Sequence, residues 1–338
     1  MKRARPILAT ALAAVVCAGT LQRAGAQDSA FYGSKTLNLV VGYSAGGGYD
    51  QYARLLARHF GRHIPGQPNV VVQNMPGAAS LTAVRHLANA APKDGTAITM
   101  FDPGLILESL SVPEKFNVKF SDYQYLGGMS RDVTICYAWH ATGIKTWADM
   151  MQRKEFLVGL TAKGSAAYAN GAVLRKLFKA PIRQIGGYPG SNEQRLAVER
   201  GELEGLCASW SAIPRDWIIN RKLNVLARFG PINPADMPAA PYVHDLATTQ
   251  EQRDVLAILN APGQLGRPFI MAKEVPRERV RILTTAFAQT LQDPALLAEA
   301  QKQSLPIELF SAAESETIIR TIYAASPELI RKVKDVYD

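Results

Sequence analysis

The sequence predicts an α/β protein of two domains, each built on a mainly parallel sheet flanked by helices. The length of 338 residues suits two domains at roughly 150 residues each. Strand-like apolar segments alternate with amphipathic helical segments in two successive cycles, which favours sheets with crossover helices. Hydrophobic residues make up 47% and charged residues 20%, an ordinary globular composition that excludes a disordered chain, a coiled coil or a disulfide scaffold.

The first cycle occupies residues 37–101. Apolar residues recur at helical spacing from Tyr49 to Phe60, just after the first apolar run. The expected strands are 37–43, 70–74 and 96–101, and the expected helices are 49–60 and 80–89.

The second cycle occupies residues 133–230. Its expected strands are 133–139, 156–161, 181–188, 203–210 and 223–230, and its expected helices are 145–153, 166–178 and 192–200. The remaining chain is expected to give a strand at 267–272 and helices at 276–292, 294–303 and 312–336.

The N-terminus has the pattern of a secretory signal peptide. Three cations, Lys2, Arg3 and Arg5, precede an apolar run from Ile7 to Leu21, and Ala24-Gly25-Ala26 supplies a cleavage site after Ala26. The run is too short to favour a transmembrane anchor, and Val16 disfavours a lipoprotein signal at Cys17. Cleavage would also remove Arg23 and lower the formal net charge from +9 to +5. No basic block remains, so we expect no nucleic-acid partner.

Two cysteines remain in the mature chain, Cys136 and Cys207. Export implies an oxidising compartment, so they could form a disulfide. Both lie in apolar, strand-like segments, and we favour the interpretation that they are two buried thiols.

Glycine-rich turns carry the strongest functional signal. Gly46, Gly47 and Gly48 join the first strand to a helix, and backbone N–H groups there can face an anion such as a carboxylate or a phosphate. The alternative is a tight turn without a ligand. Three similar turns lie at 74–80, 163–165 and 188–191. Because ligands bind at the carboxyl ends of strands in open α/β sheets, the four turns are expected to meet at one cleft.

Enzyme and metal chemistry have weaker support. Gly42-x-Ser44-x-Gly46 matches the nucleophile elbow of a serine hydrolase, but it follows the first strand and has no evident histidine partner. Gly48 stands where a P-loop needs lysine. His59 and His63 have no third ligand and are expected to be solvated. We expect no metal and no cofactor.

The same motifs resemble a known family. The segments YSAGGGYDQYARLLARHF, VVVQNMPGAAS, APKDGT, AKGSAAY, YPGSNEQRLAVERGELEG and PRERVRILTTAFAQTLQDP span nearly the whole mature chain. Together they are similar to the periplasmic solute receptors of tripartite tricarboxylate transporters, the Bug-type receptors.

This resemblance implies a type II periplasmic-binding-protein fold, with 27–130 plus 228–338 as lobe one and 131–227 as lobe two. It implies a monomeric, non-enzymatic periplasmic receptor that captures a small organic carboxylate and delivers it to the large and small membrane subunits of a transporter. A sensor that docks on a signalling partner remains an alternative. Receptors of this kind hold the ligand carboxylate with backbone N–H groups and bridging waters rather than with a buried arginine.

The resemblance also implies the ligand-binding residues. In lobe one they are Ser44, Ala45, Gly46, Gly47, Asp50, Gly77 and Ala78, and in lobe two they are Gly164, Ser165, Gly190 and Ser191.

Three departures from the family pattern bear on the ligand: Glu204, Asp102, and Ala79-Ser80 in place of two glycines. The two acids are expected to place negative charge near the cleft, and we count Asp102 among the ligand-binding residues. That charge disfavours a tricarboxylate and leaves a mono- or dicarboxylate, or an amine-bearing acid. Asp102 would either repel a second carboxylate or meet a ligand amine.

Overall fold

The computed structural model describes residues 31–130 and 133–337. The predicted signal peptide, residues 1–26, and its cleavage after Ala26 lie outside these residues. Within the described part of the chain, none of the helices is both long and apolar enough to cross a membrane.

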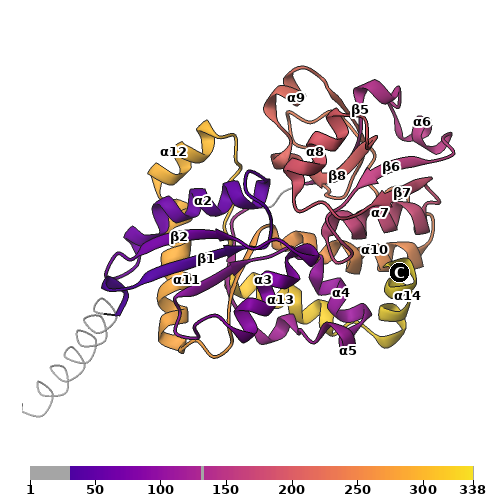
Figure 1. The fold of residues 1–338 in the computed structure, drawn as a ribbon. Helices are drawn as coiled ribbons and strands as arrows, with labels where there is room; N and C mark the ends of the chain where they lie inside the picture. Colours follow the sequence, from indigo (N-terminus) through magenta and orange to yellow (C-terminus); the bar gives the residue numbers. More distant parts are fainter. Residues whose placement is uncertain (1–30, 131–132, 338) are drawn as a thin grey trace, which may run out of the picture.

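The chain forms two lobes, each centred on one sheet (Figure 1). The first sheet has the order β11-β4-β10-β3-β1-β2 and the second has the order β7-β6-β8-β5-β9. The strands of the first sheet are β1 (Thr36–Val41), β2 (Asn69–Asn74), β3 (Ala97–Met100), β4 (Gln124–Gly128), β10 (Pro268–Met271) and β11 (Phe310–Ser311). Those of the second are β5 (Thr134–Trp139), β6 (Phe156–Gly159), β7 (Ile182–Ile185), β8 (Gly205–Ser209) and β9 (Leu223–Arg228).

Both sheets are mixed, so the two-lobed α/β prediction is confirmed but the expectation of mainly parallel sheets is wrong. Parallel pairing holds for β2-β1-β3 in the first sheet and for β7-β6-β8 in the second. The other pairings, through β10, β4 and β11 and through β5 and β9, are antiparallel. Strand β4 was not predicted, because its sequence QYLGG ends in two glycines, which strands disfavour.

The helices follow the predicted order, with additions. The longer helices are α2 (Gly48–Phe60), α3 (Leu81–Asn89), α7 (Ala166–Leu177), α8 (Ser191–Glu199), α10 (Gln250–Asn260), α11 (Arg277–Gln292), α12 (Pro294–Lys302), α13 (Ala312–Tyr323) and α14 (Pro327–Tyr337). The shorter ones are α4 (Leu105–Ser111), α5 (Pro113–Phe116), α6 (Trp147–Met151) and α9 (Arg215–Ile219). The single helix expected at 312–336 is two helices, because Pro327 cannot continue a helix but suits the first position of a new one.

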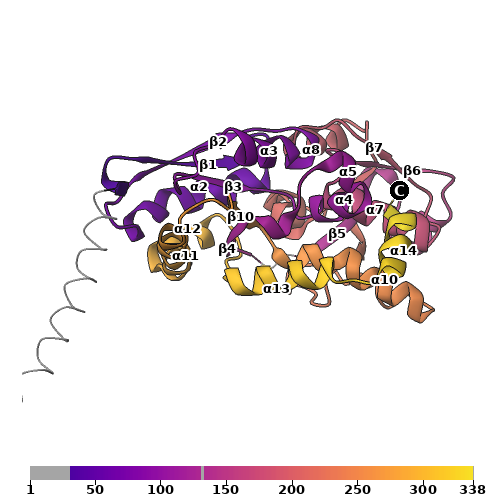
Figure 2. The ribbon, with the colours of Figure 1, turned by 90° about the horizontal axis from the view of Figure 1, so that it is seen from below.

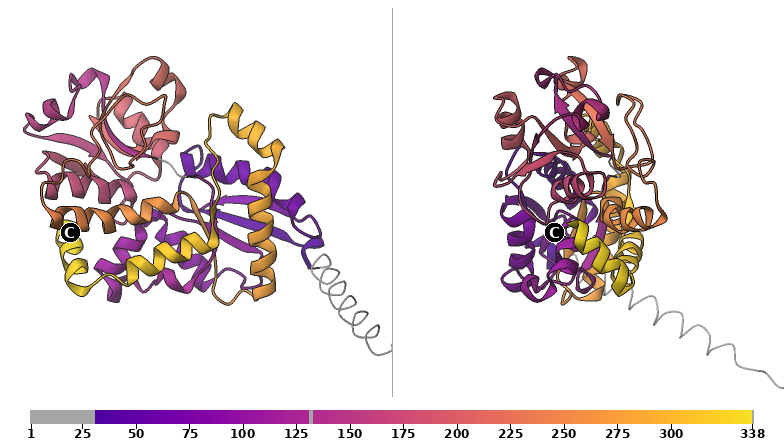
Figure 3. Two further views of the ribbon diagram at one scale, coloured as in Figure 1. Left: turned by 180° about the vertical axis from the view of Figure 1, so that it is seen from behind. Right: turned by 90° about the vertical axis from the view of Figure 1, so that its right-hand side faces the viewer.

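The C-terminal third of the chain contributes to both lobes. Leu256 and Leu259 of α10 and Val333 and Tyr337 of α14 are buried in the same core cluster as Phe156 of the second sheet. The division expected from the sequence had assigned all of 228–338 to lobe one. Figure 2 shows α13 and α10 along one side of the molecule, and Figure 3 (left), seen from behind, shows this orange and yellow part of the chain crossing the near face of both lobes.

Cys136 and Cys207 form a disulfide bond, so the preference for two buried thiols is wrong. The two residues lie directly opposite each other in the antiparallel pair β5 and β8. They are 71 residues apart in sequence, so their alignment depends on the register of two strands that the sequence alone does not give. A loop of this length, once closed, lowers the entropy of the unfolded chain by an amount worth about 4 kcal/mol in the chain-entropy model.

Candidate functional site

A cavity of about 90 Å³ lies between the two lobes. The first lobe lines it with Tyr43, Gly47, Gly48, Tyr49, Asp102 and Arg267. The second lobe lines it with Thr134, Thr161, Ser165, Ala166, Ala167, Ser191, Gln194, Cys207, Ala208, Ser209 and Ala212. Because both lobes supply walls, a molecule in this cavity contacts both.

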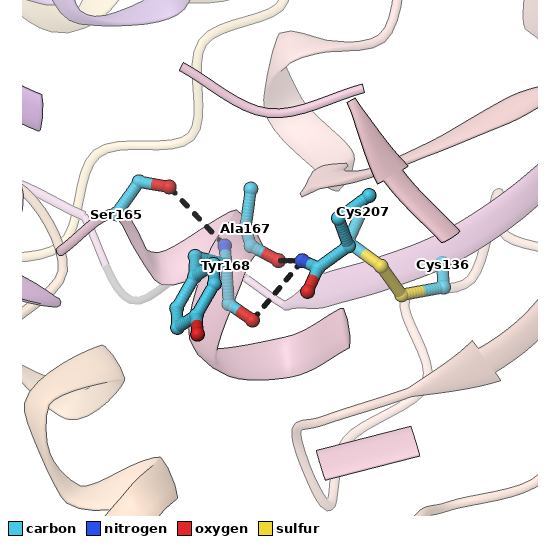
Figure 4. The surroundings of a disulfide bond; sticks show 6 residues. Cys136, Ser165, Ala167, Tyr168 and Cys207 are labelled. Carbon is cyan, nitrogen blue, oxygen red and sulfur yellow. Dashed lines mark hydrogen bonds between the residues drawn. A yellow bond between two sulfur atoms is a disulfide. The ribbon is translucent and has the colours of Figure 1, made fainter. Parts of the chain in front are cut away.

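The first residues of three helices face this cavity. Gly48 begins α2 after β1, Ala166 begins α7 after β6, and Ser191 begins α8 after β7. Helix N-termini carry N–H groups without intrahelical partners and the positive end of the helix dipole. No side chain caps α2 or α8, whereas the hydroxyl of Ser165 accepts a hydrogen bond from the backbone N–H of Tyr168 in α7 (Figure 4).

The loop before α2 is held by Asp50. Gly46 has a φ of +80°, which favours glycine, and its N–H donates to Asp50 at 2.9 Å. Arg54 Nε and Asn74 Nδ2 also donate to this carboxylate, each at 2.9 Å. Burial raises the pKa of Asp50, but the hydrogen bonds from Arg54, Gly46 and Asn74 outweigh it and leave the pKa below its usual value. Asp50 therefore orders the loop, and it is not among the residues that line the cavity.

Asp102 connects the two lobes. One carboxylate oxygen accepts from the backbone N–H of Gly104 at 2.8 Å and from that of Ala166 at 3.0 Å. The other accepts from the hydroxyl of Tyr43. All three partners are donors, which suits an ionised carboxylate, although burial is the largest influence and raises the pKa of Asp102. The sequence left two roles open, repulsion by a free carboxylate or contact with a ligand amine. The structure shows a third, a bridge from lobe one to the N-terminus of α7.

Arg267 is the one cation that lines the cavity among the described residues, and it is not among the site residues predicted from the sequence. Its side chain packs over the rings of Tyr52 and Tyr49, with centroid distances of 4.3 and 5.1 Å. Nη2 donates to the hydroxyl of Ser211, in the second lobe, at 3.0 Å. Only 3% of the residue is exposed. A single arginine before a short apolar strand carries no motif, so no sequence signal distinguished it.

Ser44 joins the lobes at the edge of the cavity. Its backbone N–H donates to Pro189 at 3.3 Å, and its hydroxyl donates to Glu193 at 2.9 Å. The catalytic triad that goes with a nucleophile elbow would place a histidine at this hydroxyl. His59 and His63 instead pair with Glu299 and Asp293, at 2.6 and 2.7 Å, so the expectation that they are solvated is wrong.

The predicted site residues divide into two groups. Gly47, Asp102, Ser165 and Ser191 line the cavity together. The others, Ser44, Ala45, Gly46, Asp50, Gly77, Ala78, Gly164 and Gly190, lie outside its lining. Residues 44–46 and 190 belong to the turns before α2 and α8, and Asp50 lies in the first turn of α2, whereas Ala78 is exposed before α3.

Glu204 does not place charge near the cleft, so that expectation is wrong. It accepts from the backbone N–H of Leu157 at 2.9 Å and pairs with Arg153 at 2.7 Å. It precedes β8, whereas the cavity is lined by the later residues of that strand. No group of three or more potential metal ligands occurs among residues 31–130 and 133–337.

Comparison with known proteins identifies the fold. No family model and no curated protein matches the sequence. Among solved structures, the periplasmic binding protein BugD matches with a TM-score of 0.72 and 15% identity, covering 90% of this chain and 98% of that one. MatC from Rhodopseudomonas palustris, with bound malate, matches with a TM-score of 0.71 and 15% identity over 90% and 99% of the two chains. A second R. palustris protein, solved with adipate, matches with a TM-score of 0.69 and 17% identity, covering 89% of this chain and 98% of that one.

The chain therefore has the two-lobed fold of periplasmic binding proteins. More narrowly, its structural neighbours are binding proteins of the Bug and TctC type, which confirms the resemblance drawn from the sequence at the level of the fold.

Proposed function

We propose that this protein is a periplasmic solute-binding receptor that captures a small organic carboxylate between its lobes and delivers it to the membrane subunits of a transporter. One observation carries the proposal: the N-termini of α2 and α8, which come from opposite lobes and have no side-chain cap, both reach the cavity between the lobes. Such helix ends bind anions through backbone N–H groups and the helix dipole. Neighbours of the same fold that hold malate and adipate support a carboxylate as the anion.

The working step is closure of the lobes around the ligand. Contacts that cross between lobes already surround the cavity: Ser44 to Glu193, Arg267 to Ser211, and Asp102 to Ala166. A ligand that touches both lobes stabilises this closed arrangement by its greater affinity for it. Binding without chemical conversion is the function that this arrangement supports best.

Native mass spectrometry of the purified protein tests the proposal, followed by calorimetric titration with propionate, lactate, succinate, malate and inorganic phosphate. We expect a co-purifying carboxylate, or binding of at least one carboxylate from the panel. Ligand at a hundred times its Kd should raise the free energy of unfolding by about 2.7 kcal/mol. Binding of phosphate alone would contradict the proposal.

The hydrolase alternative is tested with p-nitrophenyl esters. Because the Ser44 hydroxyl donates to Glu193 rather than to a histidine, we expect no turnover that depends on it. Ester hydrolysis that disappears in Ser44→Ala would instead support an enzyme.

A further inference from the structure

The charges on the cavity wall restrict the ligand further. We infer that the cavity takes a compact monocarboxylate, whose carboxylate pairs directly with Arg267, while Asp102 occupies the position that a second ligand carboxylate would need. This inference rests on the proposed carboxylate-binding function and names the class of carboxylate.

The positive end of the cavity gathers three anion-attracting groups. A Cβ placed on Gly48 would lie 3.3 Å from Nη2 of Arg267, so the guanidinium reaches the first turn of α2. A Cβ placed on Gly47 would lie 2.9 Å from the hydroxyl of Ser191, so α8 begins beside the same point. The guanidinium and the first residues of α2 and α8 all line this cavity, and a carboxylate bound between them would meet all three.

Arg267 is suited to bind that carboxylate directly. Arg267 is 3% exposed, and burial strengthens the attraction of its charge for an anion beside it. The rings of Tyr49 and Tyr52 pack on its guanidinium. A guanidinium fork matches the two oxygens of a single carboxylate. This differs from the backbone-and-water recognition that the family resemblance implies.

The negative end of the cavity is Asp102. Its carboxylate accepts the N–H of Ala166, the first residue of α7, at 3.0 Å, and Ser165 caps the same helix. The anion-binding capacity of α7 is therefore used by the protein itself. A second ligand carboxylate at this end would lie beside a like charge, which is unfavourable in a buried site.

Most of the other residues that line the cavity have short side chains. Besides the charged pair it offers four alanines, two threonine hydroxyls and three serines, together with the rings of Tyr43 and Tyr49 and the amide of Gln194. This surface and the volume of about 90 Å³ suit a short ligand body that is apolar or carries a hydroxyl. Propionate and lactate are therefore the monocarboxylates to test. Succinate and malate are their dicarboxylate counterparts, and free alanine is the counterpart that carries an amine.

Calorimetric titration of these five compounds tests the inference on four proteins: wild type, Arg267→Met, Asp102→Asn and Arg228→Met. Arg228 is the matched control, because it also packs on a tyrosine, Tyr242 at 5.0 Å, but does not line this cavity. In the wild type we expect lactate or propionate to bind at least tenfold more tightly than malate or succinate.

Among the variants, we expect Arg267→Met to weaken monocarboxylate binding by about a hundredfold, as for loss of one partner of a buried charge pair. Asp102→Asn should reduce the preference for monocarboxylates by about tenfold, because it removes the like charge. Arg228→Met should bind as the wild type does.

Three results would overturn the inference while leaving the proposed function intact: tighter wild-type binding of malate or succinate, tighter binding of alanine, or undiminished affinity in Arg267→Met. If Arg267→Met does not fold, Arg267→Lys replaces it, with an expected loss of about tenfold because the charge stays but the fork is lost. Wild-type affinity in Arg267→Lys would then count against direct fork pairing. Failure of the wild type to bind any carboxylate would overturn the proposed function and this inference together.

Discussion

The N-termini of α2 and α7 arise from similar sequences but have different surroundings. Each follows a strand and a glycine-containing turn, AGGGYD in the first lobe and AKGSAAY in the second. At α2 the N-cap is Gly47, which has no side chain to offer, whereas at α7 it is Ser165, whose hydroxyl accepts from Tyr168. A strand-turn-helix pattern therefore predicts where an anion can bind, but the N-cap residue decides whether the N–H groups there are already hydrogen-bonded within the protein.

The acids beside the two helices sharpen this difference. Asp50 belongs to α2 itself and points back to the turn, where it holds Gly46. Asp102 reaches α7 from the other lobe, so its bond to Ala166 exists only when the lobes are together. A hydrogen bond to a charged group contributes about 2 kcal/mol. When the lobes are together, the N-terminus of α7 is therefore bonded to Asp102 of the other lobe, whereas the N-terminus of α2 can accept a ligand.

The largest effect should come from blocking the approach to α7. A Cβ on Gly104 would lie 2.5 Å from the backbone N of Ala166 and 2.6 Å from the backbone C of Ser165, both in the opposite lobe. Overpacking of this kind costs up to about 3 kcal/mol. Of the five titrated compounds, the one that the wild type binds most tightly should therefore bind to Gly104→Ala with roughly a hundredfold lower affinity. Calorimetry measures the affinity, and small-angle scattering should show that saturating ligand no longer compacts the protein.

Gly263→Ala is the control for this substitution. A Cβ on Gly263 meets no atom within 4 Å, so the variant should bind and close like the wild type. Unchanged affinity in Gly104→Ala would mean that binding does not require the lobes to come as close as they do here.

A smaller loss is expected at α2. A Cβ on Gly47 would lie 2.9 Å from the hydroxyl of Ser191, which can rotate away, but the branches of valine would also cover the open helix end. Gly47→Val should lower the affinity for the same ligand by about tenfold, or roughly 1.4 kcal/mol. Gly47→Ala should give an intermediate Kd by calorimetry. If both variants bind like the wild type, the glycine loop is only a turn.

The local part of the site could be predicted from the sequence. Glycines next to a strand end indicated the N-terminus of α2. Gly47, Ser165 and Ser191 line one cavity, because turns after parallel strands lie at the carboxyl ends of their own sheet and those ends of both sheets border the cavity. Asp102 was singled out because it departs from the family pattern. Its role as a bridge could not be foreseen, since that role depends on how closely the second lobe approaches.

The rest depends on packing between distant segments. Arg267 reaches the cavity only because β10 pairs with β3 in the middle of the first sheet, a pairing of segments about 170 residues apart. Cys136 and Cys207 are bonded because of strand register, and Glu204 is remote from the cleft because it precedes its strand. None of these follows from local periodicity, which reports which face of an element is buried but not its neighbours.

Substitution of Asp50 tests how much the ordered turn before α2 contributes to stability and to ligand affinity. Asp50→Ala removes the acceptor of three hydrogen bonds and should lower the free energy of unfolding by about 2 kcal/mol. Because Gly47 and Gly48 keep their place in the chain, affinity should fall only about threefold, or roughly 0.6 kcal/mol. Asp216→Ala, which removes the surface pair with Lys222 at 3.1 Å, should cost at most about 1 kcal/mol.

The pH dependence gives this prediction a sign. The pKa of Asp50 is lowered in the folded protein, so its contribution is present above the unfolded value of about 3.9 and is lost as the pH falls through the folded value. Stability of the wild type should therefore rise with pH across that window more steeply than stability of Asp50→Ala. Equal slopes in denaturant titrations from pH 3 upward (about one unit below the ordinary aspartate value) would contradict the assigned role.

The smallest effect on binding should follow from uncapping α7. The Ser165 hydroxyl donates to the carbonyl of Ala162 at 2.9 Å and accepts from the N–H of Tyr168 at 3.1 Å, so its one proton is committed within the protein although the residue lines the cavity. Ser165→Ala should cost about 1 kcal/mol of stability, as for other N-caps, and change the Kd by less than about twofold. Thr146→Ala is the control, because Thr146 caps α6 away from the cavity and should cost a similar amount. Chemical denaturation and calorimetry on both variants separate the two roles of the hydroxyl. A tenfold loss of affinity in Ser165→Ala alone would show that the hydroxyl turns to the ligand on binding, and that α7, like α2, is a ligand site rather than one the protein has filled for itself.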